Sequence, residues 1–186
     1  MTRWAWVGYL LVLGSCDLFG ARTPEDPEGE AGTWQQPVAP DLVVDNIRAA
    51  ISELNASNYR RSLHEEFEFV PSSDARARNP DRWINWNRAQ ENGHFVTLAE
   101  ASRGSSNNSL RLEDMTTELG ESQYIIDASY ILVISHGSQQ LSDTLQGRLA
   151  WFIILEADGL WTLKKWNDQS IGSQDSWSDL KSEFAS

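Results

Sequence analysis

The chain has 186 residues, a length that suits one domain rather than two. Hydrophobic residues make up 40% and include nine tryptophans, which excludes wholesale disorder. A net charge of -12 excludes the basic surface on which nucleic-acid binding depends. With one cysteine and three histidines, we expect no internal disulfide, no metal site and no cofactor.

The first residues have the plan of a secretory signal. One cation, Arg3, precedes the apolar run Trp4–Leu13, and two small residues lie directly before Cys16. This run has ten residues, whereas a helix needs about 20 to cross a bilayer. We therefore expect residues 1–15 to be removed as a signal peptide.

The four residues Leu13-Gly-Ser-Cys16 resemble the lipobox of bacterial lipoproteins. The resemblance implies cleavage before Cys16, lipidation of its sulfur and stable anchoring of a water-soluble domain in the bacterial cell envelope, facing the periplasm or the exterior. The alternatives are an ordinary signal peptide with an incidental cysteine, or a buried start of the domain. Asp17 resembles the inner-membrane retention signal of enterobacterial lipoproteins, and the choice between inner and outer membrane stays open.

Residues 16–39 are predicted to form a disordered tether. They are rich in proline, carry the acidic patch Glu25–Glu30 and show no apolar periodicity. An extended spacer of this length reaches on the order of 70 Å, at roughly 3 Å per residue. Trp34 is expected to be an incidental aromatic, with docking to a partner as the alternative. The folded domain is predicted to cover residues 40–186.

The folded part is predicted to begin with a helical hairpin. Apolar residues at i, i+4, i+7, i+8 and i+11 predict a helix from Pro40 to Leu54. The four-residue spacing of Tyr59, Leu63 and Phe67 predicts a second helix. Alternation over residues 67–71 then predicts a short strand that stops at a proline.

A longer helix is predicted to follow an irregular stretch at residues 72–78. Asn79 and Pro80 have the cap and first-turn residue types of a helix start. Trp83 and Trp86 follow at helical spacing, and the apolar face continues to about Ser102. Polar residues from there to position 109 predict a loop.

The remainder is predicted to be an antiparallel meander. The four alternating runs are Leu110–Leu119, Gln123–His136, Leu141–Glu156 and Gly159–Asp168, and short turns separate them. Within residues 124–134 the face opposite Tyr130 is also largely apolar, so we expect something to cover part of it. The spacing of Trp177, Leu180 and Phe184 predicts a short amphipathic helix after Ser176.

This order of elements resembles the NTF2-like (SnoaL/ketosteroid-isomerase-like) α+β cone. The matching motifs are Asn55-x3-Tyr59-x3-Leu63-x3-Phe67-Glu-Phe-Val-Pro71 and Gly159-x-Trp161-x4-Trp166-x-Asp168. The resemblance implies N-terminal helices packed on a curved antiparallel sheet around a conical cavity. Enzymes of this family place an Asp base and Tyr or Asp hydrogen-bond donors in that cavity.

Several residues are candidates for such a site, each with a structural alternative. The catalytic candidates are Asp127, Asp168 and Tyr59, because a carboxylate in an apolar pocket has a raised pKa and can act as acid or base. Asp127 and Tyr130 lie an odd number of residues apart, so a regular strand places them on opposite faces. The candidates for ligand binding, with core packing as the alternative, are Trp83, Trp86, Tyr130, Trp151 and Trp166.

The histidines give no catalytic or metal-binding pattern. His64 is followed by two acids, but neighbouring residues on a helix point apart, so we expect a solvated helix face. His94 and His136 each stand alone and are expected at the surface or as caps. No triad spacing and no nucleotide-binding motif occurs in the sequence.

Three functional hypotheses follow from the sequence. The leading one is a membrane-tethered, non-catalytic NTF2-like domain that binds a small apolar ligand or an envelope protein. A SnoaL or ketosteroid-isomerase type of enzyme would instead need a buried Asp within hydrogen-bond reach of a Tyr inside the cone. A dimeric assembly module would pair through its sheet face.

Overall fold

A computed structural model describes residues 32–185. The predicted signal peptide, Cys16 and the tether up to residue 31 lie outside the described residues. Within the described range, no helix has both the length and the apolar character needed to span a bilayer.

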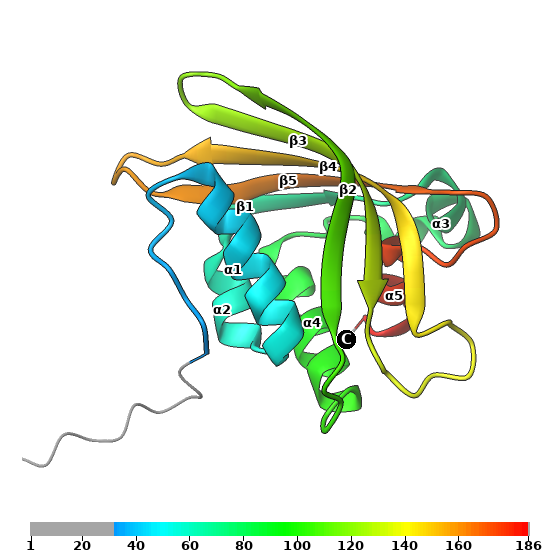
Figure 1. The fold of residues 1–186 in the computed structure, drawn as a ribbon. Helices are drawn as coiled ribbons and strands as arrows, with labels where there is room; N and C mark the ends of the chain where they lie inside the picture. Colours follow the sequence, from blue (N-terminus) through cyan, green and yellow to red (C-terminus); the bar gives the residue numbers. More distant parts are fainter. Residues whose placement is uncertain (1–31, 186) are drawn as a thin grey trace, which may run out of the picture.

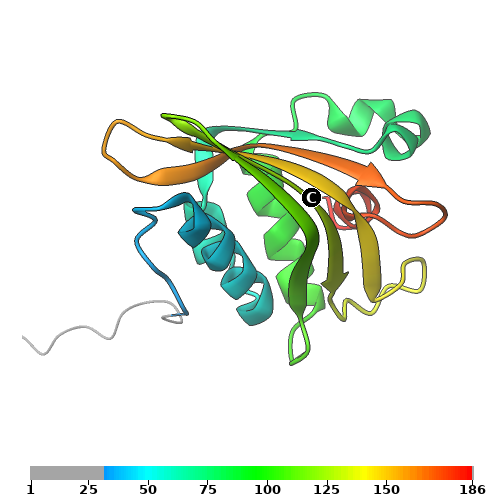
Figure 2. The same ribbon diagram turned by 45° about the horizontal axis from the view of Figure 1, so that its top comes forward.

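The domain consists of helices packed on one curved sheet (Figures 1 and 2). The elements in chain order are α1 (Pro40–Glu53), α2 (Ala56–Arg61), β1 (Leu63–Val70), α3 (Ser73–Arg78), the 3-10 helix η1 (Pro80–Trp83), α4 (Arg88–Ala101), β2 (Ser109–Leu119), β3 (Gln123–Val133), β4 (Thr144–Leu155), β5 (Trp161–Ser170) and α5 (Trp177–Glu183). The strand order is β1-β5-β4-β3-β2. The predicted α+β class is confirmed.

The meander from β2 to β5 forms as the alternating sequence predicts. Its neighbouring strands are antiparallel, whereas β1 pairs parallel with β5. Helices α1, α2 and α4 lie under the concave face, and α5 lies under the same face near α3 (Figure 1). Strand alternation sends Tyr130, Trp151 and Trp166 into the space between sheet and helices, where all three are buried.

The second predicted helix is shorter than its spacing indicates. Asn55 caps α2, since its side chain accepts a hydrogen bond from the Asn58 backbone N–H at 3.0 Å. The helix ends at Arg61, and β1 begins at Leu63. A spacing of four residues also fits the two-residue period of a strand. Parallel pairing with β5 decides between helix and strand, so Leu63 and Phe67 belong to a strand.

The region between β1 and β2 also differs from the prediction. Residues 73–78, expected to be irregular, form α3, whose cap Ser72 accepts a hydrogen bond from the Ala75 N–H. The long helix predicted from Asn79 is divided into η1 and α4. Asn85 adopts a left-handed φ of 61°, which interrupts the helix. Trp83 and Trp86 therefore precede α4 rather than lie on it.

The segment before α1 packs against the domain. The side chain of buried Asn46 accepts a hydrogen bond from the Gln35 N–H at 2.9 Å and donates one to the Gln35 carbonyl at 2.7 Å. The guanidinium of Arg61 lies 4.1 Å from the centroid of the Trp34 ring. These contacts give Trp34 a packing role and place the start of the packed domain near residue 33, ahead of the predicted Pro40.

Candidate functional site

Side chains from α5 fill the interior that the resemblance implies as a conical cavity. Trp177, Leu180 and Lys181 are at most 2% exposed. The Trp177 ring meets Trp166 edge to face at 4.3 Å and Tyr130 at 5.5 Å between centroids. α5 therefore occupies the part of the cone where the sheet carries its largest aromatic side chains.

One buried network joins the start of α5 to the sheet. The Tyr130 hydroxyl donates to Asp168 Oδ1 at 2.8 Å and accepts a hydrogen bond from the Trp177 N–H at 2.7 Å. The Ser178 backbone N–H donates to Asp168 Oδ2 at 2.8 Å, and the Ser178 hydroxyl donates to the same oxygen. Asp168 thus has the Tyr partner that an enzyme of this fold would need, but its hydrogen bonds also hold α5.

This network depends on a glycine in β4. Gly147 is paired with Tyr130, and a Cβ at Gly147 would lie 2.5 Å from the Tyr130 hydroxyl. Only the absence of a side chain leaves room for the Tyr130 hydroxyl to reach Asp168 and α5.

A second buried network surrounds Glu91 on α4. The Tyr59 hydroxyl donates to Glu91 Oε1 at 2.6 Å, and the Trp86 indole donates to Oε2 at 2.7 Å. The ammonium of Lys181 also donates to Oε1 and forms an ion pair with the carboxylate. Both charged side chains have no solvent exposure. Residues from α2, α4 and α5 therefore meet at one ion pair in the middle of the domain.

Aromatic rings complete the surroundings of Lys181. Its Nζ lies 4.3 Å from the centroid of Trp166, 4.4 Å from Phe69 and 5.8 Å from Trp177. These distances fall within the range of cation–π attraction, which is about 6 Å. The ammonium thus has one carboxylate and three aromatic neighbours.

The pKa values of Glu91, Lys181 and His94 are all lowered in the interior, for different reasons. Desolvation opposes ionisation of Glu91, but the Lys181 ammonium and the hydrogen bonds outweigh it and lower the pKa of the carboxyl. Desolvation lowers the pKa of Lys181 despite Glu91. Desolvation and then the Lys181 charge lower the pKa of His94 to about 3, so this imidazole is neutral.

Asp168 and the two buried tyrosines shift in the opposite sense. Desolvation raises the pKa of Asp168, although the hydrogen bonds from Ser178 and Tyr130 counteract it. Desolvation and the neighbouring carboxylates raise the pKa of Tyr59 and of Tyr130 well above the usual value. Both hydroxyls therefore remain protonated donors at neutral pH.

The predicted site residues fall into separate places. Asp168 and Tyr59 lie inside the cone, whereas Asp127 lies on the outer face of the sheet in an ion pair with Arg148. Asp127 and Tyr130 face opposite sides, as their spacing predicts. The indole of Trp83 donates to the Ala75 carbonyl at 3.2 Å, so Trp83 packs against α3.

Among the described residues, two candidate tryptophans carry unpaired polar atoms. The ring N–H groups of Trp151 and Trp166 are buried and have no hydrogen-bond partner within residues 32–185. A buried donor without a partner is uncommon in folded proteins. Trp86 differs, because its indole donates to Glu91.

The expectation of a surface or capping role is wrong for His94, which is fully buried. His136 does cap a turn, since its Nδ1 accepts a hydrogen bond from the Ser138 N–H at 3.1 Å. His64 lies on β1 rather than on a helix. Within residues 32–185, no cluster of three or more His, Cys, Asp or Glu side chains could hold a metal ion.

Sequence reasoning missed Glu91 and Lys181, although the helical spacing contains a signal for both. Lys181 lies four residues after Trp177 and three before Phe184, so it falls within the apolar stripe of α5. Glu91 likewise lies four residues before Phe95 on the buried stripe of α4. When each of two helices carries a charged residue within its apolar stripe, and the two charges are opposite, a buried ion pair is indicated.

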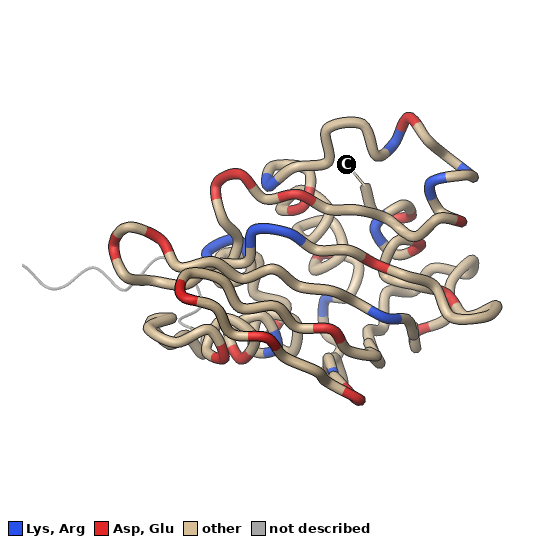
Figure 3. Tube along the Cα trace, turned by 90° about the horizontal axis from the view of Figure 1, so that it is seen from above, with Lys and Arg blue, Asp and Glu red and all other residues tan. Residues whose placement is uncertain are grey.

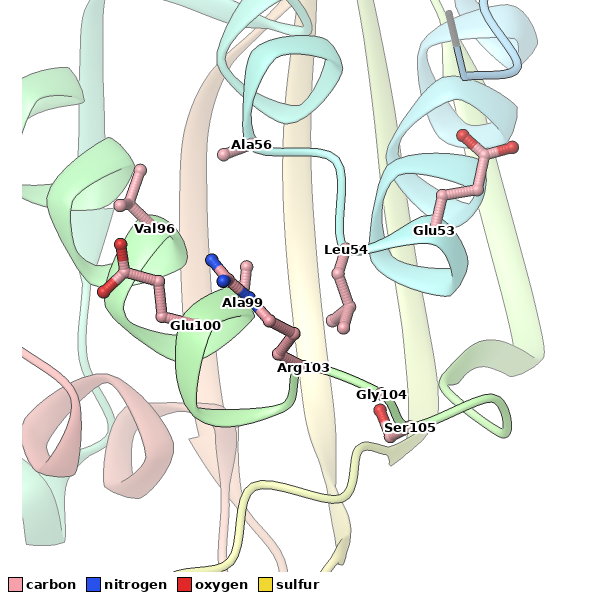
Figure 4. Close-up of a pocket in the computed structure, with 9 residues that line it drawn as sticks. All are labelled: Glu53, Leu54, Ala56, Val96, Ala99, Glu100, Arg103, Gly104 and Ser105. Carbon is pink, nitrogen blue, oxygen red and sulfur yellow. The ribbon is translucent and has the colours of Figure 1, made fainter. Parts of the chain in front are cut away.

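The hollows found on the domain lie at its surface. The residues around one of them, of about 660 Å³, come from the end of α1, the start of α2 and the end of α4 (Figure 4). Its lining includes Leu54, Val96 and Ala99 together with Glu100 and Arg103. None of the predicted catalytic or ligand-binding residues lines it.

Solved structures with the same fold come from several bacteria. An NTF2-like superfamily protein from Salmonella enterica is 10% identical, with a TM-score of 0.54 over 70% of this chain and 87% of that one. An NTF2-like protein of unknown function in nutrient uptake from Rhodospirillum rubrum is 12% identical, with a TM-score of 0.54 over 72% and 99%. An NTF2-like protein from Cytophaga hutchinsonii is 12% identical, with a TM-score of 0.50 over 69% and 93%.

The sequence itself matches no protein-family model and no curated protein. At identities of 10–12% the likeness concerns the fold alone. The element order, the curved sheet and the short C-terminal helix agree with it. The chain has the NTF2-like fold.

Proposed function

We propose that this protein is a membrane-tethered, non-catalytic NTF2-like domain that pairs with a second copy of itself through the outer face of its sheet. One observation carries the proposal. The cone is filled by the domain's own side chains, while the opposite face of the sheet has half-buried apolar residues, and no helix within residues 32–185 covers its centre (Figure 2). These features therefore favour binding of a protein surface on the outer face over binding of a small apolar ligand in the cone.

The outer face combines apolar side chains with paired charges. Its central apolar residues, all half-buried, are Ile125, Ile131, Val133, Phe152 and Ile154. Asp127 pairs with Arg148 on the same face, and Lys164 pairs with Glu66 toward the β1 edge. Both acidic and basic positions occur along this side of the molecule (Figure 3).

This balance of charge favours a second copy as the partner. The chain carries a net charge of -12, so two copies repel each other at most of their surfaces. The ion pairs reduce that repulsion where the apolar residues gather. A face that meets itself across a two-fold axis needs such self-complementarity.

The proposed anchor leaves the outer face accessible. The backbone N–H of Thr33 donates to the Glu53 carboxylate at the end of α1, at 2.9 and 3.0 Å from its two oxygens. The tether from Cys16 therefore joins the domain on its helical side, away from the outer face (Figure 1). A lipid-anchored copy can pair sideways with its neighbour in the same membrane.

Sedimentation of residues 17–186 tests the pairing. We expect the wild type to be dimeric and Phe152→Glu to be monomeric, because pairing would have to remove water from a carboxylate at the centre of the interface. Val96→Glu is the matched control, since Val96 is an exposed apolar residue on α4, and it should remain dimeric. A wild type that is monomeric at all concentrations refutes the pairing.

The anchor has its own test. Mass spectrometry of the mature amino terminus should find a diacylglycerol thioether on Cys16, and Cys16→Ser should release the protein from membranes. Separation of the two envelope membranes then shows whether Asp17 retains the protein at the inner one. Normal maturation and membrane binding of Cys16→Ser would refute the anchor.

An enzyme of the SnoaL or ketosteroid-isomerase type is the second candidate, favoured by the 2.8 Å hydrogen bond between Tyr130 and buried Asp168. This function requires α5 to leave the cone so that substrate can reach the carboxyl. Deuterium exchange into simple ketones in heavy water, followed by NMR, tests it. Exchange that Asp168→Asn abolishes supports the enzyme, and no exchange above the buffer rate counts against it.

A further inference from the structure

The environment of the Lys181 ammonium has the composition of a cation-binding site. Glu91 supplies a carboxylate, and Phe69, Trp166 and Trp177 present rings at 4.3 to 5.8 Å from Nζ. Proteins that recognise organic ammonium groups use this combination of aromatic faces and negative charge. Here the bound cation is a side chain of the same molecule.

Stability alone gives little reason for this arrangement. A buried ion pair loses most of its Coulombic gain to desolvation, and well-packed apolar residues of similar volume are often as stable or more so. Phe69, Trp166 and Leu180 already make an apolar interior around the pair. The charges at this point are therefore better explained by recognition than by packing.

The element that carries Lys181 is a short helix. α5 has seven residues, and the exposed residues 171–174 join it to β5, with Gly172 in a left-handed conformation at φ 58°. Its withdrawal would remove one cation and leave the Glu91 and Asp168 carboxylates in the cone. It would also open the interior around the ring N–H groups of Trp151 and Trp166, which have no partner within residues 32–185.

We propose that the cone is a binding site for an organic ammonium group, that Lys181 occupies it in the closed state, and that a ligand with a primary or methylated ammonium group displaces α5. The two carboxylates select a cation over a neutral or anionic ligand. The rings of Phe69 and Trp166 select an alkylated ammonium over a hydrated metal ion. This site lies on the concave side and is separate from the outer-face pairing.

The first test replaces the side chain by a free ligand. Lys181→Ala removes three carbons and the nitrogen, which is the size of n-propylammonium. We expect this amine to bind the variant with a dissociation constant on the order of 1 mM, measured by calorimetry. At about 100 times that constant, it should shift the unfolding equilibrium toward the folded state about 100-fold.

Two controls separate recognition of charge from filling of a cavity. The neutral isostere 1-propanol should leave Lys181→Ala unchanged, and n-propylammonium should not stabilise Leu180→Ala, which loses a buried neighbour on the same helix. Equal effects of the amine and the alcohol, or no effect of the amine, would overturn the cation site.

A second test uses the wild type and does not depend on how the variant folds. Trimethylpropylammonium at saturating concentration should speed backbone hydrogen exchange in residues 177–183 at least about twofold, because exchange reports local opening. Residues 145–153 of β4 should be unchanged, and sodium chloride at equal ionic strength should have no effect. Unchanged exchange in α5 would overturn displacement by the ligand.

Discussion

Replacement of Lys181 by methionine tests how much stability the domain loses when the buried Glu91 carboxylate is left without its cation. Methionine fills similar space but leaves the Glu91 carboxylate, which has no solvent exposure, without its cation. The carboxyl must then either stay charged in the interior or take up a proton. Breaking a buried pair by removing one partner typically costs about 3–5 kcal/mol.

The size of the stability loss in Lys181→Met, and its pH dependence, follow from proton uptake by the Glu91 carboxyl. Protonating a carboxyl with an ordinary pKa of 4.5 at pH 7 costs about 3.4 kcal/mol, and about 0.8 kcal/mol at pH 5. In the variant the folded-state pKa of Glu91 lies above the unfolded value, so stability is lost as the pH rises. We expect a deficit of about 3 kcal/mol at pH 7 that shrinks to about 1 kcal/mol at pH 5.

Urea unfolding of wild type and Lys181→Met at the two pH values measures this deficit. Leu180→Ala is the control, because it removes buried apolar volume and should give a loss that does not change with pH. The double variant with Glu91→Gln should recover part of the loss, since no charge is then left without a partner. Equal stability of Lys181→Met and wild type at pH 7, or the same deficit at both pH values, would refute the reasoning.

Two further predictions concern buried groups around α5. In the unfolded chain His94 takes up a proton below its ordinary pKa of 6.5, whereas in the folded protein it does so only near a pKa of about 3. Between pH 7 and pH 4.5 the free energy of unfolding of the wild type should therefore fall by about 2–3 kcal/mol. Urea unfolding should show this fall in the control His136→Gln but not in His94→Gln. A slope that persists in His94→Gln would contradict this. Gly147→Ala should destabilise the domain by about 1–3 kcal/mol, because its Cβ would lie 2.5 Å from the Tyr130 hydroxyl and 2.6 Å from the Gln169 carbonyl oxygen. Thermal unfolding that matches the wild type would show that β4, β5 and Tyr130 accommodate the methyl group without cost.

The local pattern of the sequence was sufficient for the elements whose neighbours are close in the chain. Short turns between alternating runs predict the meander, because adjacent strands then have little choice of partner. The helical spacing of apolar residues predicts both α1 and α5, since each helix buries one apolar face against the domain. The α+β class follows from these elements together.

Tertiary structure decided between helix and strand, and between exposed and buried acids, where the local sequence pattern fits both. Tyr59, Leu63 and Phe67 fit both periods, and pairing with β5 made the last two part of a strand. Asp127 pairs with Arg148 on the exposed side, while Asp168 is enclosed, although both are acids within alternating runs.

The ion pair depends most on the fold. Glu91 and Lys181 are 90 residues apart in sequence, and nothing near either one specifies the other. They meet because α4 and α5 both lie under the concave face, where each buried charge neutralises the other. Sequence by itself determined the layers and the faces of the domain, and only the packed structure decided which charge lies opposite which.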